Sequence, residues 1–391
     1  MQAVLRLGEQ LGGEFVIPTD ADTTRAPCRQ NWADEMRGSV VVLPTTLIRP
    51  LLRALGGEAL TPPPWWLMRQ AGRYLPEYRA IRAKARDFIE LCLTPSLAAE
   101  LTLQPVRRYR MDAAILFSDI PLVPHALGQG LTYREGEGPV LEPIEDNAGI
   151  ARLKLGQIQS RLEPVFEAVD LVAAALGPET ALIGFAGAPW TMATYMVEGG
   201  ASRDFRRVKS WAYRDIEGFG ALIELLVEGT IDFLSAQIEA GAEVVQLFDS
   251  WAGVLPEAAF GRLVIEPTRR IVAAIKQRFP DHPIIGFPRG AGLLYERYIT
   301  ETGVDCVGLD AMVPAGYARS RLQRLATVQG NLDPVLLIAG GAALETAVAE
   351  LCRTLGGGPF VFNLGHGVLP ETPPENVAAL ASLLAGSNAI K

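Results

Sequence analysis

Beyond the prolines at positions 62–64, the chain alternates between short apolar runs and longer segments with helical periodicity. The runs are continuously apolar or nearly so, which is typical of parallel strands buried on both faces. Eight runs are predicted as strands: 65–69, 113–117, 181–185, 243–248, 283–287, 304–309, 326–330 and 360–363. This order of strand and helix signals predicts an α/β fold with a parallel sheet.

The segments between the runs carry apolar residues three and four positions apart, which is the spacing of an amphipathic helix. Clear examples are residues 94–107, 219–240, 257–278 and 343–355. Each is long enough to carry the chain across a sheet to the next parallel strand. Eight such alternations predict a (β/α)8 barrel of the TIM type, which needs about 250 residues in its minimal form.

Two segments lie outside this alternation. Residues 119–180 follow the second predicted strand, and the glycines at 136 and 138 within them predict a β-hairpin. Residues 1–44 lack the layout of a secretory signal, and we interpret them as an N-terminal extension. We therefore expect one barrel domain over residues 45–391 with an insertion after the second strand. The competing architecture, a doubly wound open sheet, would carry a GxGxxG turn, which the sequence lacks.

Composition narrows the class of protein. The 391 residues are 49% hydrophobic and 20% charged, which excludes an intrinsically disordered chain. The net charge of -8 argues against a protein that binds nucleic acids or acidic membranes through its overall charge. The four cysteines are far apart in the sequence and form no CxxC pair, so we expect neither a disulfide framework nor a zinc ribbon. This use of cysteine indicates a reducing, cytoplasmic setting. No apolar run approaches the length of about 20 residues that spans a bilayer.

Basic residues are concentrated in one segment. Residues 69–86 contain six basic residues and one acidic residue, whereas the rest of the chain contains 30 basic and 43 acidic ones. Such a local excess on an acidic protein can steer an anion into one cleft. Arg69 and Arg73 directly follow the first predicted strand, and guanidinium groups can bind carboxylates through two parallel hydrogen bonds. We therefore expect these two arginines to bind an anion.

Polar residues also follow other predicted strands, and in a (β/α)8 barrel the strand ends form the active-site mouth. Asp119 follows the second strand, where it is either a helix N-cap or a carboxylate that stabilises a cation or accepts from an N–H donor. Tyr195 and Ser250 follow the third and fourth strands, and Tyr195 also fits an ordinary core position. His366 lies between two glycines after the last strand, where it is either a ligand contact or a structural histidine.

Several catalytic classes lack their usual signatures. The sequence has no Walker loop, no GxSxG elbow and no HExxH pair. Phosphoryl transfer, serine hydrolysis and zincin chemistry are therefore not indicated.

Several longer motifs resemble those of the uroporphyrinogen decarboxylase family. They are WLMRQAGRYLPEYR (66–79), ELTLQP (100–105), AILFSDI (114–120), GFAGAPWT (184–191), YMVEGG (195–200), QLFDS (246–250), QGNLDP (329–334) and FNLGHGV (362–368). The resemblance extends from about residue 62 to residue 384. It implies a (β/α)8 barrel, usually a homodimer, that works without a cofactor or a metal.

The resemblance also implies a reaction. The family removes CO₂ from the four acetate groups of uroporphyrinogen, a macrocycle of four pyrroles that also carries four propionates, and so produces coproporphyrinogen. It assigns catalysis to Asp119 and Arg69, with the proton donor left open between Arg69, a water molecule and the aspartate. It assigns substrate binding to Arg69, Gln70, Arg73, Arg82, Asp119, Phe185, Tyr195, Phe248, Ser250 and His366. One departure is Trp251, where some relatives carry histidine.

Two other functions remain open at this point. Corrinoid-dependent methyltransferases share the barrel, but they bind zinc through a His-x-Cys pair, and no such pair occurs in this sequence. A tetrapyrrole carrier without catalytic activity would share the cationic mouth, but it would not need Asp119 for turnover.

Overall fold

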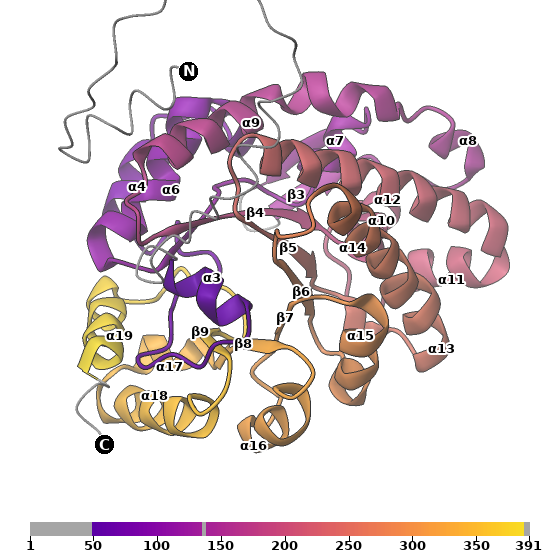
Figure 1. Ribbon diagram of the computed structural model, residues 1–391. Helices are drawn as coiled ribbons and strands as arrows, with labels where there is room; N and C mark the ends of the chain where they lie inside the picture. Colours follow the sequence, from indigo (N-terminus) through magenta and orange to yellow (C-terminus); the bar gives the residue numbers. More distant parts are fainter. Residues whose placement is uncertain (1–48, 135–137, 387–391) are drawn as a thin grey trace, which may run out of the picture. The chain divides into compact units, whose positions relative to one another are not determined.

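The computed structural model describes residues 49–134 and 138–386, which are built around a curled parallel sheet (Figure 1). Its seven strands have the order β1-β4-β5-β6-β7-β8-β9, and every neighbouring pair is parallel. They are β1 (Ala113–Ile115), β4 (Ala181–Gly187), β5 (Val244–Asp249), β6 (Ile284–Pro288), β7 (Cys306–Gly308), β8 (Thr327–Leu332) and β9 (Phe360–Leu364). These strands confirm seven of the eight predicted runs to within two or three residues at each end.

The first predicted strand, 65–69, is not a strand of this sheet. It makes one parallel bridge, from Trp65 to Phe362 of β9. On its other side, the Trp65 carbonyl accepts a hydrogen bond of 3.0 Å from the Asp112 amide just before β1. The Pro64 carbonyl still accepts from the Phe362 amide at 2.9 Å, but the prolines at 62–64 have no N–H to donate. Within the run, the Leu67 and Met68 amides donate to the side chains of Gln70 and Asn363, so no ladder continues there. The two edge strands are nevertheless both bonded to this one segment.

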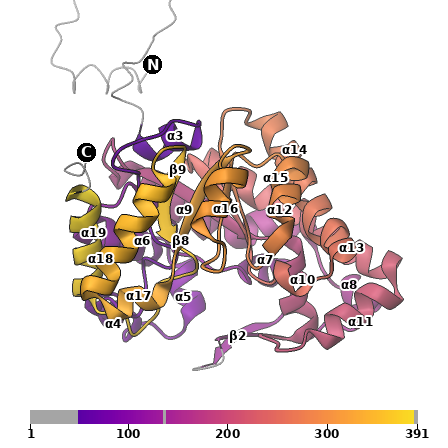
Figure 2. The same cartoon turned by 90° about the horizontal axis from the view of Figure 1, so that it is seen from below.

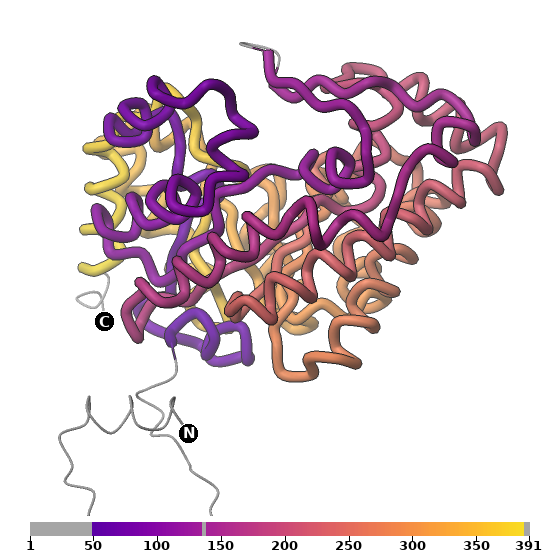
Figure 3. Tube along the Cα trace, turned by 90° about the horizontal axis from the view of Figure 1, so that it is seen from above, coloured from indigo at the N-terminus to yellow at the C-terminus, as the bar shows by residue number. Residues whose placement is uncertain are grey.

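Helices lie outside the curled sheet (Figures 1 and 2). The longer ones are α6 (Pro95–Tyr109), α9 (Ile158–Ala175), α10 (Pro189–Glu198), α11 (Arg206–Arg214), α12 (Ile216–Glu239), α14 (Glu266–Arg278), α15 (Tyr295–Thr302), α18 (Gly341–Leu355) and α19 (Pro374–Gly386). Shorter ones are α3 (Pro50–Leu55), α4 (Pro76–Arg82), α5 (Phe88–Leu93), α7 (Leu122–Ala126), α8 (Asn147–Ile150), α13 (Glu257–Phe260), α16 (Ala315–Tyr317) and α17 (Pro334–Ala339). Helix α19, at the yellow end of the trace in Figure 3, packs against α6 in the purple part of the chain, and the Tyr109 hydroxyl donates to the Pro374 carbonyl at 3.2 Å.

The apolar core has two parts. The larger part lies between the sheet and the surrounding helices. The smaller part fills the inside of the curl, where Trp66, Ile183, Phe287 and Val361 are at most 1% exposed. Side chains of a parallel strand point alternately to its two faces, so continuous apolar runs supply both cores at once.

The segment between β1 and β4 contains the predicted hairpin. Strands β2 (Leu131–Arg134) and β3 (Gly138–Leu141) pair antiparallel. The turn residues 135–137 lie outside the described residues, as does the predicted extension 1–44. The Leu141 amide donates to the Gly199 carbonyl at 3.0 Å, which fastens the end of the hairpin to the end of α10.

The predicted helix 257–278 is divided by a π-helical turn, Gly261–Ile265, between α13 and α14. Pro267 has no N–H to donate to the carbonyl of Leu263, so the usual hydrogen-bond ladder cannot continue through this point. No helix in the described ranges is long and apolar enough to cross a membrane.

Candidate active site

The predicted site residues lie at or beyond the carboxyl ends of the strands. Asp119 is in the loop from β1 to α7, and Tyr195 is on α10, which follows β4. Ser250 follows β5 directly, and His366 follows β9. Because all strands of the sheet are parallel, these ends meet on the same side of it.

Asp119 is partly buried, and both of its carboxylate oxygens accept hydrogen bonds. Oδ1 accepts from the Ile120 amide at 2.8 Å, and Oδ2 accepts from the Tyr133 hydroxyl at 2.6 Å. Burial raises the pKa of Asp119, while the two hydrogen bonds and the positive charge of Arg69 act in the opposite direction. This carboxylate is therefore held by neutral donors and lies within the field of one guanidinium group.

Arg69 has an exposed side chain and a left-handed backbone conformation, with φ of 59°. A residue with a Cβ adopts this conformation at a cost of about 1–3 kcal/mol, and such strain is concentrated at functional sites. The loop is fixed by neighbouring bonds: the Met68 amide donates to Asn363 Oδ1 at 3.0 Å, and the Val368 amide donates to the Met68 carbonyl at 2.8 Å. The strained backbone thus holds Arg69 beside the loop that carries His366.

The charge of Arg69 reaches three other predicted site residues. It opposes the rise in the pKa of Asp119, it opposes the rise in the pKa of Tyr195, and it adds to the fall in the pKa of His366. The charge of Arg69 therefore acts on all three of these residues.

Arg73 and Arg82 approach the same site from the segment around α4. Burial raises the pKa of Tyr78 to about 12, the positive charges of Arg82 and Arg73 oppose this rise, and the charge of Asp119 adds to it. The Tyr78 hydroxyl therefore lies within the fields of both arginines and of Asp119. Arg82 also donates to the Ala85 carbonyl at 3.3 Å, which fixes it at the end of α4.

Gln70 differs from the other predicted site residues. Its side chain is fully buried. Its amide oxygen accepts from the Leu67 amide at 3.2 Å, and its amide nitrogen donates to the Ala113 carbonyl at 3.1 Å. Gln70 therefore ties the loop of Arg69 to the start of β1, and both ends of its amide are already in use.

Aromatic residues border the site. The rings of Phe185 on β4 and Phe248 on β5 meet edge to face, with centroids 5.4 Å apart. The Tyr195 ring lies 4.3 Å from the ring of Trp251, whose carbonyl accepts from Trp190 Nε1 at 3.0 Å. Trp251 thus packs directly on a predicted site residue, and Ser250 is its neighbour in the chain.

Comparison with known proteins decides the family. Residues 46–385 match the model of the URO-D family, described as uroporphyrinogen decarboxylase. The chain belongs to the uroporphyrinogen decarboxylase family. It is 59% identical to the uroporphyrinogen decarboxylase of Rhodospirillum rubrum, over 88% of this chain and 98% of the relative. It is 54% identical to that of Granulibacter bethesdensis, over 86% of this chain and 98% of the relative.

Among solved structures, a methyltransferase from Methanosarcina mazei superposes with a TM-score of 0.68 at 18% identity. The match covers 87% of this chain and 98% of the methyltransferase. At this identity the likeness shows the fold that the uroporphyrinogen decarboxylase family shares with that protein, and it shows nothing about the reaction.

In this member of the uroporphyrinogen decarboxylase family, His366 is a neutral residue. Burial and the positive charges of Arg69 and Arg289 lower its pKa to about 3. A neutral imidazole has one donor and one acceptor nitrogen, so at neutral pH His366 can bind a polar group but cannot attract an anion by charge.

One residue beside Asp119 was not predicted, and a second was predicted only as a polar residue at a strand end, without a role. Tyr133 on β2 donates to Asp119, although it is part of the hairpin and follows no strand of the parallel sheet. Asp249, the last residue of β5, is 1% exposed and accepts from the Thr191 hydroxyl through Oδ1. Its Oδ2 has no hydrogen-bond partner among the described residues. The motif around Asp249 was recognised, but only its neighbour Ser250 was interpreted as functional.

Asp249→Asn is expected to change how stability depends on pH. Burial raises the pKa of Asp249 from 3.8 to about 7, so the folded chain binds a proton that the unfolded chain has released. The wild-type free energy of unfolding therefore falls as pH rises from about 4 to 7, by roughly 3 kcal/mol for this group. Urea unfolding at several pH values should show the variant gaining that amount relative to wild type over this range. A difference in the free energy of unfolding between variant and wild type that stays the same at every pH would contradict this prediction.

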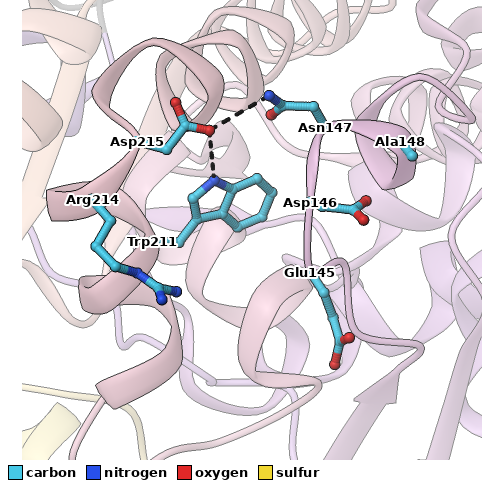
Figure 4. A pocket seen from close by; sticks show the side chains of 7 residues that line it. All are labelled: Glu145, Asp146, Asn147, Ala148, Trp211, Arg214 and Asp215. Carbon is cyan, nitrogen blue, oxygen red and sulfur yellow. Dashed lines mark hydrogen bonds between the residues drawn. The ribbon is translucent and has the colours of Figure 1, made fainter.

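A pocket of about 550 Å³ is lined by none of these residues (Figure 4). It is lined by Glu145, Asp146, Asn147, Ala148, Trp211, Arg214 and Asp215. Trp211 Nε1 and Asn147 Nδ2 both donate to Asp215 Oδ2, each at 3.5 Å. Its lining has three carboxylates and one guanidinium group, which is the reverse of the arginine-rich site, so we do not place the active site in this pocket. No cluster of three or more metal-binding side chains occurs among the residues described.

Proposed function

We propose that this chain removes the four acetate carboxyl groups of uroporphyrinogen III as CO₂ and releases coproporphyrinogen III, as a cofactor-independent carboxy-lyase of tetrapyrrole biosynthesis. The observation that carries the proposal is the position of Asp119 within the field of the Arg69 charge. A single partly buried carboxylate lies within the field of a strained arginine, with Arg73 and Arg82 nearby. This arrangement suits a ligand with anionic groups at its periphery and N–H donors at its centre.

The arginines bind the periphery of the substrate. Its eight carboxylates need cationic partners, and guanidinium groups hold them in a fixed orientation. Arg69, Arg73 and Arg82 supply these charges, while Tyr195, Ser250 and His366 supply neutral hydrogen-bonding groups. Phe185 and Phe248 supply apolar surface for the pyrrole rings. Gln70 contributes by holding the loop of Arg69 through its two backbone contacts.

Asp119 acts on the centre of the substrate. Loss of CO₂ leaves an electron pair on the former acetate methylene carbon, and a pyrrole ring protonated at carbon can receive that pair. The ring is then cationic until CO₂ leaves. The exocyclic methylene carbon then takes up a proton and the ring carbon releases its own, which leaves a methyl group on a restored pyrrole. The Asp119 carboxylate accepts from the pyrrole N–H groups and stabilises this positive charge, a contribution of several kcal/mol for a preorganised group. The proton donor is Arg69, a water molecule or Asp119 itself.

The proposal extends to the fold and the assembly. We infer a closed (β/α)8 barrel over residues 45–391, with the 119–180 segment as an insertion, because the Trp65 segment bonds to both edge strands. We also infer a cytoplasmic homodimer. Leu293 and Met312, on the loops after β6 and β7, are 88% and 87% exposed and supply apolar surface for a second copy.

Anaerobic incubation with uroporphyrinogen III tests the function. Chromatography should resolve porphyrinogens with seven, six, five and four carboxyl groups in succession, together with CO₂. Binding of uroporphyrinogen without any loss of carboxyl groups by folded protein would instead favour a tetrapyrrole carrier. Methyl transfer to a thiol in place of CO₂ release would favour the methyltransferase alternative.

Gly367→Ala is expected to lower kcat/KM for decarboxylation about 10-fold or more. A Cβ at this position would lie 2.3 Å from Arg69 Cδ and 3.0 Å from Arg69 Cβ, so the arginine would have to move. A displacement of about 1 Å in a positioning group costs up to about 10²-fold in rate. The matched control is Gly220→Ala on α12, where a Cβ has no neighbour within 4 Å. Equal activity in the two variants would show that the position of Arg69 does not matter.

A further inference from the structure

The hairpin contributes a side chain to the proposed site that the strand ends do not supply. Tyr133 is the third residue of β2, and its hydroxyl donates to Asp119 Oδ2 at 2.6 Å. The ring is partly buried and lies 4.8 Å from the ring of Phe88 on α5. Phe88 in turn lies 5.4 Å from Phe117, two residues before Asp119. Tyr133 is therefore held against Asp119 by ring packing as well as by the hydrogen bond.

The contact leaves part of the carboxylate open. An ionised carboxylate offers about four acceptor positions. The Ile120 amide and the Tyr133 hydroxyl each use one, on different oxygens. The remaining positions can accept pyrrole N–H groups, and the carboxylate cannot rotate without breaking both bonds.

Tyr133 also keeps its own proton. Burial, the charge of Asp119 and the hydrogen bond to it hold the pKa of Tyr133 well above its ordinary value. The hydroxyl is therefore a hydrogen-bond donor over the whole working pH range. Such a donor favours the ionised form of a carboxyl group, which counteracts the effect of burial on Asp119.

We propose that Tyr133 is a positioning residue that fixes the orientation of the Asp119 carboxylate and keeps it ionised for the pyrrole N–H groups. This inference rests on the proposed function for the identity of those N–H groups. The hydrogen bond between Tyr133 and Asp119 does not depend on the proposed function. Tyr133 acts through Asp119 and takes no part in proton transfer.

Tyr133→Phe tests the proposal, because it keeps the ring that packs on Phe88 and removes only the hydroxyl. The acidic limb of the kcat/KM pH profile reports the ionisation of Asp119 in the free enzyme. We expect this limb to move about one pH unit higher, which is a loss of about tenfold at low pH that shrinks as pH rises. A merely structural role would lower kcat/KM equally at every pH, and that result would overturn the proposal.

A second measurement does not need activity. The ¹³C signal of the Asp119 carboxyl group, assigned by its loss in Asp119→Asn, can be titrated in the substrate-free protein. We expect it to titrate about one pH unit higher in Tyr133→Phe than in wild type. Unchanged titration would overturn the proposal even if decarboxylation were confirmed. A shifted titration in a chain without decarboxylase activity would uphold the Tyr133 contact and refute the proposed function.

The matched control is Tyr317→Phe. The Tyr317 hydroxyl also donates to a carboxylate, Glu296 Oε1, at 2.9 Å, but neither residue belongs to the proposed site. We expect this variant to leave both the kcat/KM profile and the Asp119 titration unchanged. A shift as large as that in Tyr133→Phe would mean that loss of any such hydroxyl produces the effect, and it would overturn the assignment.

Discussion

Asp119→Asn is expected to lower the rate of CO₂ release from uroporphyrinogen by about 10²- to 10³-fold, with porphyrinogen binding close to that of wild type. Asparagine has nearly the same shape, and its amide oxygen can accept the hydrogen bond from Tyr133 or from the Ile120 amide. It lacks the negative charge that stabilises the protonated pyrrole. Single-turnover release of CO₂ and equilibrium binding of the porphyrinogen, both measured anaerobically, separate these two effects.

The fold of the Asp119→Asn variant serves as its control. Burial raises the pKa of Asp119, so the ionised group is unfavourable for folding at this position. The neutral variant should therefore be at least as stable as wild type in urea unfolding at neutral pH. Full decarboxylase activity in the variant would remove Asp119 from the mechanism. A loss of binding as large as the loss of rate would make Asp119 a binding residue only.

Arg69→Gly is expected to reduce kcat/KM by at least about 10²-fold and to increase stability. The guanidinium group that influences Asp119, Tyr195 and His366 would be absent. The backbone at position 69 has φ of 59°, a conformation that glycine adopts without strain. Relief of this strain should raise the free energy of unfolding by about 1 kcal/mol. Steady-state kinetics and urea unfolding of the same preparation test both parts.

Arg110→Gly is the matched control for this pair of effects. Arg110 also has a left-handed backbone, with φ of 54°, at the end of α6, where glycine is the preferred residue. The variant should gain similar stability with unchanged activity. If Arg69→Gly gains stability and keeps its activity as Arg110→Gly does, Arg69 is not part of the active site.

Much of the fold could be predicted because parallel strands are buried on both faces. The runs of β4, β5, β6, β8 and β9 are apolar or nearly so, and such a run has few other uses in a globular chain. The segment 65–69 has the same pattern but makes only one bridge, because the Leu67 and Met68 amides donate to the side chains of Gln70 and Asn363. The π-helical turn within 257–278 has a similar origin in Pro267, and apolar periodicity does not detect it.

The proximity of Asp119 and Arg69 could also be predicted, since both follow strand positions whose ends meet on one side of the sheet. The environment of Gln70 could not. A polar residue between two arginines of the predicted site resembles a ligand contact, and only the structure shows that its amide is used by Leu67 and Ala113. Tyr133 was missed for a related reason. The alternation of a hairpin strand gives the face of a side chain, but it does not identify the partner it meets.

A crystal structure of the chain with coproporphyrinogen III, grown anaerobically, tests the central claim most directly. We predict pyrrole nitrogens within about 3.2 Å of the Asp119 oxygens, and carboxylates of the ligand paired with Arg69 and Arg73. A macrocycle whose nitrogens face away from Asp119, or that binds outside the reach of both arginines, would contradict the account.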